Sequence, residues 1–394
     1  MDKKLLTILI TTLLFITGVF FVFRKPAVNN EVVFWTLQMS DFAPYINGVI
    51  SDFEKENPDI KIKWVDVPFS EGEKRTLASV LSDNPPDLVN LNPDFSATLA
   101  HKGALQEISK NDLVQFNDEI LKSLETEGKI FSIPWYATSA ITIYNKNLLS
   151  DVPKTYGQIV KAAPAIRKKG AYIMLPNITE NDTMLKILNK YSQEKKVYVF
   201  TMFKNLYSKD LIPKETVTMT LSEALEKYMS GNIALIGAGA NFLNMIKENA
   251  PEIYKQTDVA PQIKGDLGQN DFSLMNFVIP LRAKHKDEAL KFALFLTNDK
   301  NQLELAKLTN VLAVNKVTLN NDFYKKYDEN DLMAKARVIS AEQLNHLQPV
   351  FRTQRNQKEI NNLVNNAVQN ILLNKSKTEK ILNELDKNVE LLER

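Results

Sequence analysis

The chain has 394 residues, 44% apolar and 24% charged, which is an ordinary globular composition for two domains or one large two-lobed domain. Its 49 Lys and Arg residues against 47 Asp and Glu give a net charge of +2, so no basic excess favours nucleic-acid binding. The lack of cysteine excludes disulfides, thiolate catalysis and a lipid-modified N-terminal cysteine, and it is compatible with export.

The first element is an uncharged, mainly apolar run over residues 5–23, preceded by Lys3 and Lys4. A signal-peptide core usually has about 7–15 residues, whereas a membrane-spanning helix needs about 17–25. The run is followed by Arg24 and Lys25 and by no small-x-small cleavage pattern. We therefore expect residues 1–30 to be an N-terminal membrane anchor with a short linker, in preference to a removed signal peptide.

Strand and helix patterns alternate along the rest of the chain. Short apolar or alternating runs predict strands over 32–35, 60–67, 88–91, 129–134, 140–145, 172–175, 233–236 and 276–279. Amphipathic spacing predicts helices over 41–55, 73–81, 96–101, 156–168, 182–192, 197–208, 222–230, 286–297 and, as a pair, within 356–394. This alternation indicates an α/β fold, in which ligands bind at the carboxyl ends of strands.

The sequence lacks the motifs that mark the common metal and cofactor enzymes. The histidines His101, His285 and His346 have no metal-ligand spacing, and no HExxH, GxSxG or phosphate-loop motif occurs. The GAGAN stretch at 237–241 carries one GxG, and we interpret it as a strand-end turn that lets backbone approach a ligand. We expect no metal and no cofactor.

Two strand-end residues have both a functional and a structural interpretation. Asp94 follows the strand at 88–91 and a turn, where it would cap a helix or contact a ligand. Trp135 begins the loop between the strands at 129–134 and 140–145, where it would stack on a sugar face or pack in a core. The residues alone leave both alternatives open.

A family resemblance extends over nearly everything from Val32 onward. It rests on these segments, in order: VVFW, FEKENPDIKIKWV, NPPDLVNL, AHKGAL, IFSIPWYATSAITIYNK, VPKTYGQIVKAA, YMSGNIALIGAGANF, DVAPQI, DEALKFALFL and NILLNKSKTEKILNEL. In this combination the chain resembles the extracellular solute-binding proteins of ABC importers, family 1, the maltose-binding-protein-like group. These proteins bind solutes and do not catalyse.

The resemblance implies a type II periplasmic-binding-protein fold, in which two α/β lobes are joined by a multi-strand hinge. It assigns 31–134 and 277–320 to lobe 1, 144–271 and 330–394 to lobe 2, and 135–143 and 272–276 to the hinge. It also implies that these residues bind the ligand: Gln38, Met39, Asp94, Trp135, Tyr136, Thr138, Asn177, Gly239, Asn241 and Arg352.

The sequence departs from the family pattern at two positions. Asn241 stands where sugar binders often have tryptophan, and Gln357 stands where the family often has an aromatic residue. These departures favour a smaller or more hydroxylated ligand than a stacked oligosaccharide, with Trp135 or Tyr136 as the stacking surface. Arg352 would bind an anionic group or cap a helix.

We therefore expect a monomeric receptor that delivers a carbohydrate or polyol to ABC permease subunits. It would be periplasmic or at the cell surface, tethered to the plasma membrane by the N-terminal helix, or secreted after cleavage. A sensor for a signalling partner and a binder of polyamines or phosphate esters are the alternatives. A membrane-tethered glycosidase would need two convergent carboxylates, and no such pair is identifiable.

Overall fold

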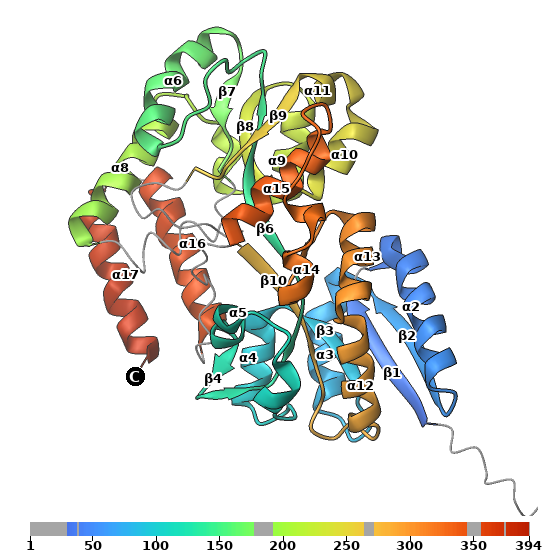
Figure 1. The fold of residues 1–394 in the computed structure, drawn as a ribbon. Coiled ribbons are helices and arrows are strands. Elements are labelled where there is room, and N and C mark those ends of the chain that lie inside the picture. Colours follow the sequence, from blue (N-terminus) through green and yellow to red (C-terminus); the bar gives the residue numbers. More distant parts are fainter. Residues whose placement is uncertain are drawn as a thin grey trace, which may run out of the picture.

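The computed structural model describes residues 30–37, 39–176, 192–263, 272–344, 356–373 and 376–393. They form two α/β lobes that share the long strand β6 (Figure 1). Within these ranges no helix has the length and apolar character needed to cross a membrane. The expected anchor at 5–23 and residues 182–191 of the expected helix at 182–192 lie outside the described residues, and Ser192 is only the N-cap of the next helix.

The first lobe is built on a mixed sheet with the strand order β2-β1-β3-β10-β6. Strand β1 is parallel to β2 and β3, and β10 is antiparallel to β3 and β6. The strands that join β6 here are β1 (Asn30–Leu37), β2 (Ile60–Val67), β3 (Leu88–Leu91), β10 (Phe272–Val278) and β11 (Leu312–Ala313). The helices are α2 (Ala43–Glu56), α3 (Phe69–Val80), α4 (Pro93–His101), α5 (Asp118–Ser123), α12 (Lys286–Leu296), α13 (Asp299–Thr309) and α14 (Lys316–Leu319).

The second lobe surrounds the other half of β6. Strand β8 is antiparallel to β6 on one edge and parallel to β7, and β9 is antiparallel to β6. These strands are β7 (Tyr172–Met174), β8 (Ile233–Gly239) and β9 (Thr257–Ala260). The helices are α6 (Tyr156–Lys168), α8 (Gln193–Ser208), α9 (Leu221–Met229), α10 (Phe242–Asn249), α11 (Pro251–Gln256), α16 (Gln357–Leu373) and α17 (Thr378–Glu393).

Strand β6 (Ile133–Asn145) connects the lobes without interruption. Residues 133–139 pair with β10, and residues 140–145 pair with β8 and β9. The sequence predicts two strands with a loop over 135–139, and that prediction is wrong. Neighbouring strands supply backbone hydrogen bonds along this stretch, so it stays extended although its local pattern is polar and aromatic.

Four clusters of buried apolar side chains divide between the lobes. Two of them draw on β1, β2, β3 and β10, and the other two on β7, β8, α6, α8, α16 and α17. In Figure 1 the C-terminal helices α16 and α17 lie beside α8, and Leu382 and Leu385 are buried there. The C-terminal tail therefore packs on the second lobe.

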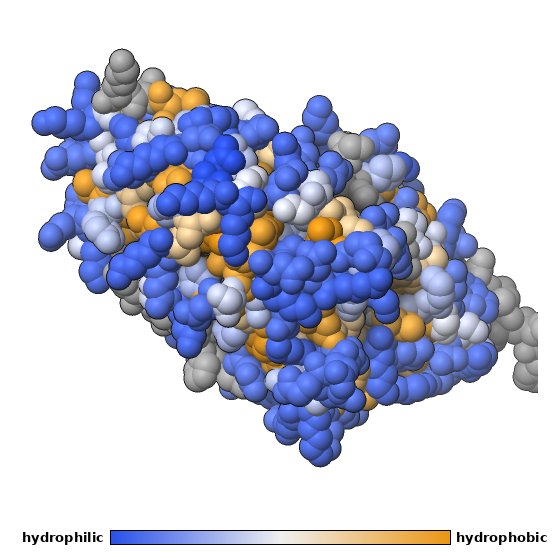
Figure 2. Space-filling model, turned by 90° about the horizontal axis from the view of Figure 1, so that it is seen from above, coloured by the Kyte–Doolittle hydropathy of each residue, from blue (hydrophilic) through white to orange (hydrophobic). Residues whose placement is uncertain are grey.

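Helix α15 (Leu332–Leu344) contributes to both lobes. Its residues Ala336 and Ile339 belong to a second-lobe cluster, whereas Ala341 and Leu344 belong to the main first-lobe cluster. Polar and charged side chains cover most of the face shown in Figure 2, and apolar residues appear between them in separate small areas. The molecule thus buries its apolar side chains mainly within each lobe.

Candidate ligand-binding site

The face of β6 that remains partly exposed carries Tyr136 and Thr138. Successive side chains of a strand point to opposite faces, and accordingly Trp135, Ala137 and Ser139 are buried while Tyr136 and Thr138 are half-buried. On β10, Met275 pairs with Tyr136 and Ser273 pairs with Thr138. Met275 is half-buried, and Ser273 is exposed. This face therefore offers one aromatic ring and three hydroxyl groups, those of Tyr136, Thr138 and Ser273, where the lobes meet.

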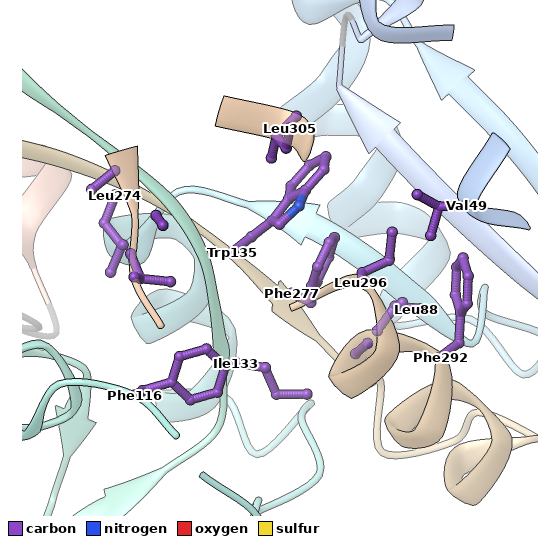
Figure 3. Packing of buried hydrophobic residues seen from close by; sticks show 14 of the residues in the cluster. Val49, Leu88, Phe116, Ile133, Trp135, Leu274, Phe277, Phe292, Leu296 and Leu305 are labelled. Atoms are coloured by element: carbon purple, nitrogen blue, oxygen red, sulfur yellow. The ribbon is translucent and has the colours of Figure 1, made fainter. Parts of the chain in front are cut away.

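Trp135 lies on the opposite face, inside the first-lobe core. Its side chain is 0% exposed, and its ring stacks on Phe277 with a centroid distance of 4.6 Å. Figure 3 shows the indole between Phe277 and Leu305. The Trp135 carbonyl accepts a hydrogen bond of 2.5 Å from Gln302 Nε2. Because its ring is enclosed, Trp135 cannot present the expected stacking surface in this conformation.

Tyr136 is the half-buried aromatic residue at this point. Its ring packs edge-to-face with the Trp135 ring, with a centroid distance of 5.0 Å and an angle of 67° between the ring planes, and its hydroxyl donates to Met39 Sδ at 3.9 Å. Burial raises the pKa of Tyr136 far above its ordinary value. A tyrosine hydroxyl is protonated at neutral pH already at its ordinary pKa, and burial reinforces this, so the group can both donate and accept hydrogen bonds.

The loop after β1 approaches Tyr136 through Met39. The Met39 side chain is 4% exposed and belongs to the first-lobe core, so its thioether faces inward and not toward solvent. The backbone N–H of Met39 donates to both carboxylate oxygens of Asp66, at 2.9 and 3.0 Å. Asp66 stands at the end of β2 and was not among the residues expected at the site. Its alternating-strand position carries no signal that would single it out.

Asp94 lies in the first turn of α4, beyond the carboxyl end of β3. Asn92 caps this helix, because its Oδ1 accepts the Phe95 N–H at 2.8 Å, so Asp94 is not the capping residue. The Asp94 side chain is half-buried near the positive end of the helix dipole. Backbone pairing runs from Leu91 of β3 through β10 to β6, which places α4 about two strand spacings, roughly 10 Å, from the Trp135–Tyr136 segment.

The second lobe contributes the end of β8. Gly239 pairs with Ala140 of β6, and a Cβ placed on Gly239 would lie 3.7 Å from Thr138 Cβ and collide with Asn241 Oδ1. The Asn241 amide thus folds over Gly239. This arrangement is possible only because residue 239 has no side chain. Asn241 Oδ1 is buried and accepts no hydrogen bond from the described residues. Such an oxygen is suited to accept a hydrogen bond from a ligand hydroxyl.

The structure thus brings together two sets of the expected residues. Met39, Trp135 and Tyr136 are in contact on the first-lobe side, and Thr138, Gly239 and Asn241 are adjacent on the second-lobe side. Asp94 stands beyond the neighbouring strands. Gln38, Asn177 and Arg352 lie outside the described residues. No group of three or more acidic or histidine side chains in the described ranges has an arrangement that could hold a metal ion.

Comparison with known proteins gives a family match over residues 48–332, more than half of the chain, to the model for bacterial extracellular solute-binding proteins. Among solved structures, one of a protein from Synechococcus sp. MITs9220 in complex with zinc has a TM-score of 0.83 and 26% identity. The similarity covers 92% of this chain and 98% of that one, which is described provisionally as an oligosaccharide periplasmic-binding protein.

Curated relatives match more locally. The maltodextrin-binding protein MdxE of Bacillus subtilis is 27% identical over 139 residues, which cover 35% of this chain and 33% of the relative. The multiple sugar-binding protein of Streptococcus mutans is 23% identical over 296 residues, or 66% of this chain and 69% of the relative. The matched part thus spans about a third of the first relative and about two thirds of the second.

Proposed function

Because the chain belongs to the bacterial extracellular solute-binding proteins, we propose that it is the carbohydrate receptor of an ABC importer. The observation that carries the proposal is the continuous strand β6, which hydrogen-bonds to strands of both lobes and exposes Tyr136 and Thr138 where they meet. A solute bound there contacts both lobes at once. Such contacts stabilise a closed arrangement that a permease can recognise.

The chemistry of the described residues supports a neutral, hydroxylated ligand. The Tyr136 ring offers a flat surface for the C–H face of a sugar, and its hydroxyl stays protonated. Thr138 and Asn241 offer a hydroxyl and an unused amide oxygen, and Asp94 offers carboxylate oxygens for sugar hydroxyls. Trp135 and Met39 support this surface from the buried side and do not face the ligand.

We assign the lobes as the resemblance implies, with 31–134 and 277–320 in lobe 1 and 144–271 and 330–394 in lobe 2. The buried clusters support this division, except near residue 340, where α15 packs in both lobes. The hinge consists of 135–143 and 272–276, which are strand segments of β6 and β10. The receptor acts as a monomer and has no catalytic role.

A thermal-shift screen of residues 31–394 tests this function. The panel contains maltotriose, diacetylchitobiose, mannitol and tagatose, with spermidine and glycerophosphocholine as the non-sugar arms. A sugar at 100 times its dissociation constant should raise the free energy of unfolding by about 2.7 kcal/mol. A shift with spermidine or glycerophosphocholine and with none of the sugars would overturn the carbohydrate assignment.

We further propose that residues 5–23 attach the receptor to the plasma membrane, so that it works at the outer surface. The full chain expressed in bacteria should then sediment with membranes and keep its N-terminus on sequencing, whereas residues 31–394 should stay in the supernatant. A soluble product that begins after residue 23 would instead mean that this segment is a removed signal.

The alternative function is a sensor for a signalling partner. It would be indicated if the protein binds a sugar and deletion of its gene leaves the uptake of that sugar by the cell unchanged.

A further inference from the structure

The end of β2 carries a carboxylate, Asp66, that accepts hydrogen bonds from Thr36 of β1 and from the backbone of Met39 in the loop after β1. Asp66 is paired directly with Thr36 of β1, and Thr36 Oγ1 donates to Asp66 Oδ1 at 2.7 Å. Trp64 Nε1 in turn donates to Thr36 Oγ1 at 2.8 Å. Because the Thr36 oxygen accepts the indole N–H, its single proton is directed to Asp66. Trp64 and Thr36 thereby set the orientation of the carboxylate.

The carboxylate then holds the loop after β1. Both of its oxygens accept the Met39 N–H, at 2.9 and 3.0 Å. Met39 is 4% exposed, so without Asp66 this N–H would lose its partner in a place with little access to water. Met39 Sδ accepts the hydrogen bond of the Tyr136 hydroxyl at 3.9 Å. An unbroken series of contacts therefore runs from β2 to the aromatic ring at the hinge.

We propose that Asp66 is a positioning residue for the ligand site, which fixes the orientation of Tyr136 through the Met39 backbone without touching the ligand. This inference rests on the proposed function, since it assumes that Tyr136 forms the stacking surface. A purely structural carboxylate would stabilise the lobe and leave the Tyr136 ring where it is. A positioning carboxylate moves the ring when it is removed, even in a lobe that remains folded.

Two substitutions at Asp66 and one control separate these possibilities. Asp66→Ala removes both acceptors. Asp66→Asn keeps Oδ1 and places an amide N–H against the Met39 N–H, so its effect should be smaller. The control is Asp59→Asn, which removes the same charge from an exposed position just before the same strand. Each variant is made in residues 31–394.

The first measurement needs no ligand. In protein labelled at the methionine methyl groups with carbon-13, the Met39 methyl resonance, assigned with Met39→Leu, reports the ring current of Tyr136. It should move in Asp66→Ala, by less in Asp66→Asn and not in Asp59→Asn, and exchange of the Met39 amide should accelerate in the same order. A wild-type Met39 amide that exchanges at the rate of an exposed loop would overturn the inference even if Asp66→Ala fails to fold.

The second measurement is the dissociation constant, by calorimetry, for whichever of maltotriose, diacetylchitobiose, mannitol and tagatose stabilises the wild type. We expect about ten-fold weaker binding in Asp66→Ala and about three-fold weaker in Asp66→Asn. An unmoved Met39 methyl resonance, or unchanged affinity in both variants, would overturn the positioning role. If no panel sugar stabilises the wild type, the proposed function fails, and the resonance measurement still decides whether Asp66 orients Tyr136.

Discussion

Replacing Gly239 by alanine should displace Asn241 and weaken ligand binding while leaving the lobe folded. The new methyl group would collide with Asn241 Oδ1, whereas its distance of 3.7 Å from Thr138 Cβ is ordinary contact. Gly239 is not among the glycines with positive φ, so alanine brings no backbone strain there. The amide of Asn241, a flexible side chain, has to rotate away and with it the oxygen that we expect to accept a sugar hydroxyl.

The size of the effect follows from the loss of one hydrogen bond. A net contribution of about 0.5–1.5 kcal/mol corresponds to an affinity loss of roughly two- to ten-fold. The free energy of unfolding should change little. Alanine restricts the unfolded chain and thereby stabilises the folded state by about 0.4–1 kcal/mol, which offsets the cost of rearranging Asn241. The matched control is Gly237→Ala on the same strand, where no heavy atom lies within 4 Å of the new Cβ.

Calorimetric titration with the panel sugar that stabilises the wild type most, together with urea unfolding, measures both quantities. In an Asn241→Ala background the Gly239→Ala substitution should have no further effect on affinity, since the displaced group is already gone. Gly237→Ala should keep wild-type affinity and unfold slightly later. Equal affinities for Gly239→Ala and Gly237→Ala, or additive losses in the double variant, would refute the reasoning.

Three further predictions concern other parts of the lobes. Trp135→Ala should lower the free energy of unfolding by about 3–5 kcal/mol because it empties a buried site. Tyr136→Phe should change the free energy of unfolding by less than about 1 kcal/mol and should weaken sugar binding. Similar unfolding curves for the two variants would contradict both assignments. Asp94→Asn should weaken sugar binding about three-fold or more by calorimetry with little change in stability, and unaltered affinity would remove Asp94 from the site. Partial burial raises the pKa of Asp258, but hydrogen bonds from Lys335, Val259 and Tyr144 and the Lys335 charge outweigh it and lower that pKa. The stability contributed by this carboxylate is therefore present at neutral pH and lost as the pH falls below about 4, so unfolding curves of wild type and Asp258→Asn should converge in acid and differ at pH 7.

Much of the fold is predictable from local patterns. The strands at 60–67 and 88–91 and the helix at 156–168 have the same bounds in the structure as in the prediction. Both strands are bounded by proline-containing turns, and the helix is followed, after its C-cap Lys169, by Gly170, whose φ of 86° suits glycine. Each of these signals acts within a few residues, so no knowledge of the neighbouring elements is needed to find them.

The hinge is different, because its structure depends on partners distant in the chain. Residues 135–139 have the composition of a loop, yet they pair with β10 and β11, which follow more than 130 residues later. Alternation along a strand predicts two faces but not which face meets solvent. With Trp135 and Tyr136 adjacent and both aromatic, either ring was a candidate for the exposed face.

The amino-acid sequence is sufficient to identify an α/β chain of the solute-binding family, to locate most helices and strands, and to point to the segments around Asp94, Tyr136 and Asn241. The helices and strands follow from periodicity and turn residues, which are local, and the family from the resemblance carried by the motifs in their order along the chain. Only the tertiary structure decides that Trp135 is enclosed, that Asn241 folds over Gly239 and that Asp66 holds Met39 beside Tyr136. Those relations arise from the packing of strands that are far apart in the chain, where burial and hydrogen-bond partners are determined by the sheet and not by neighbouring residues.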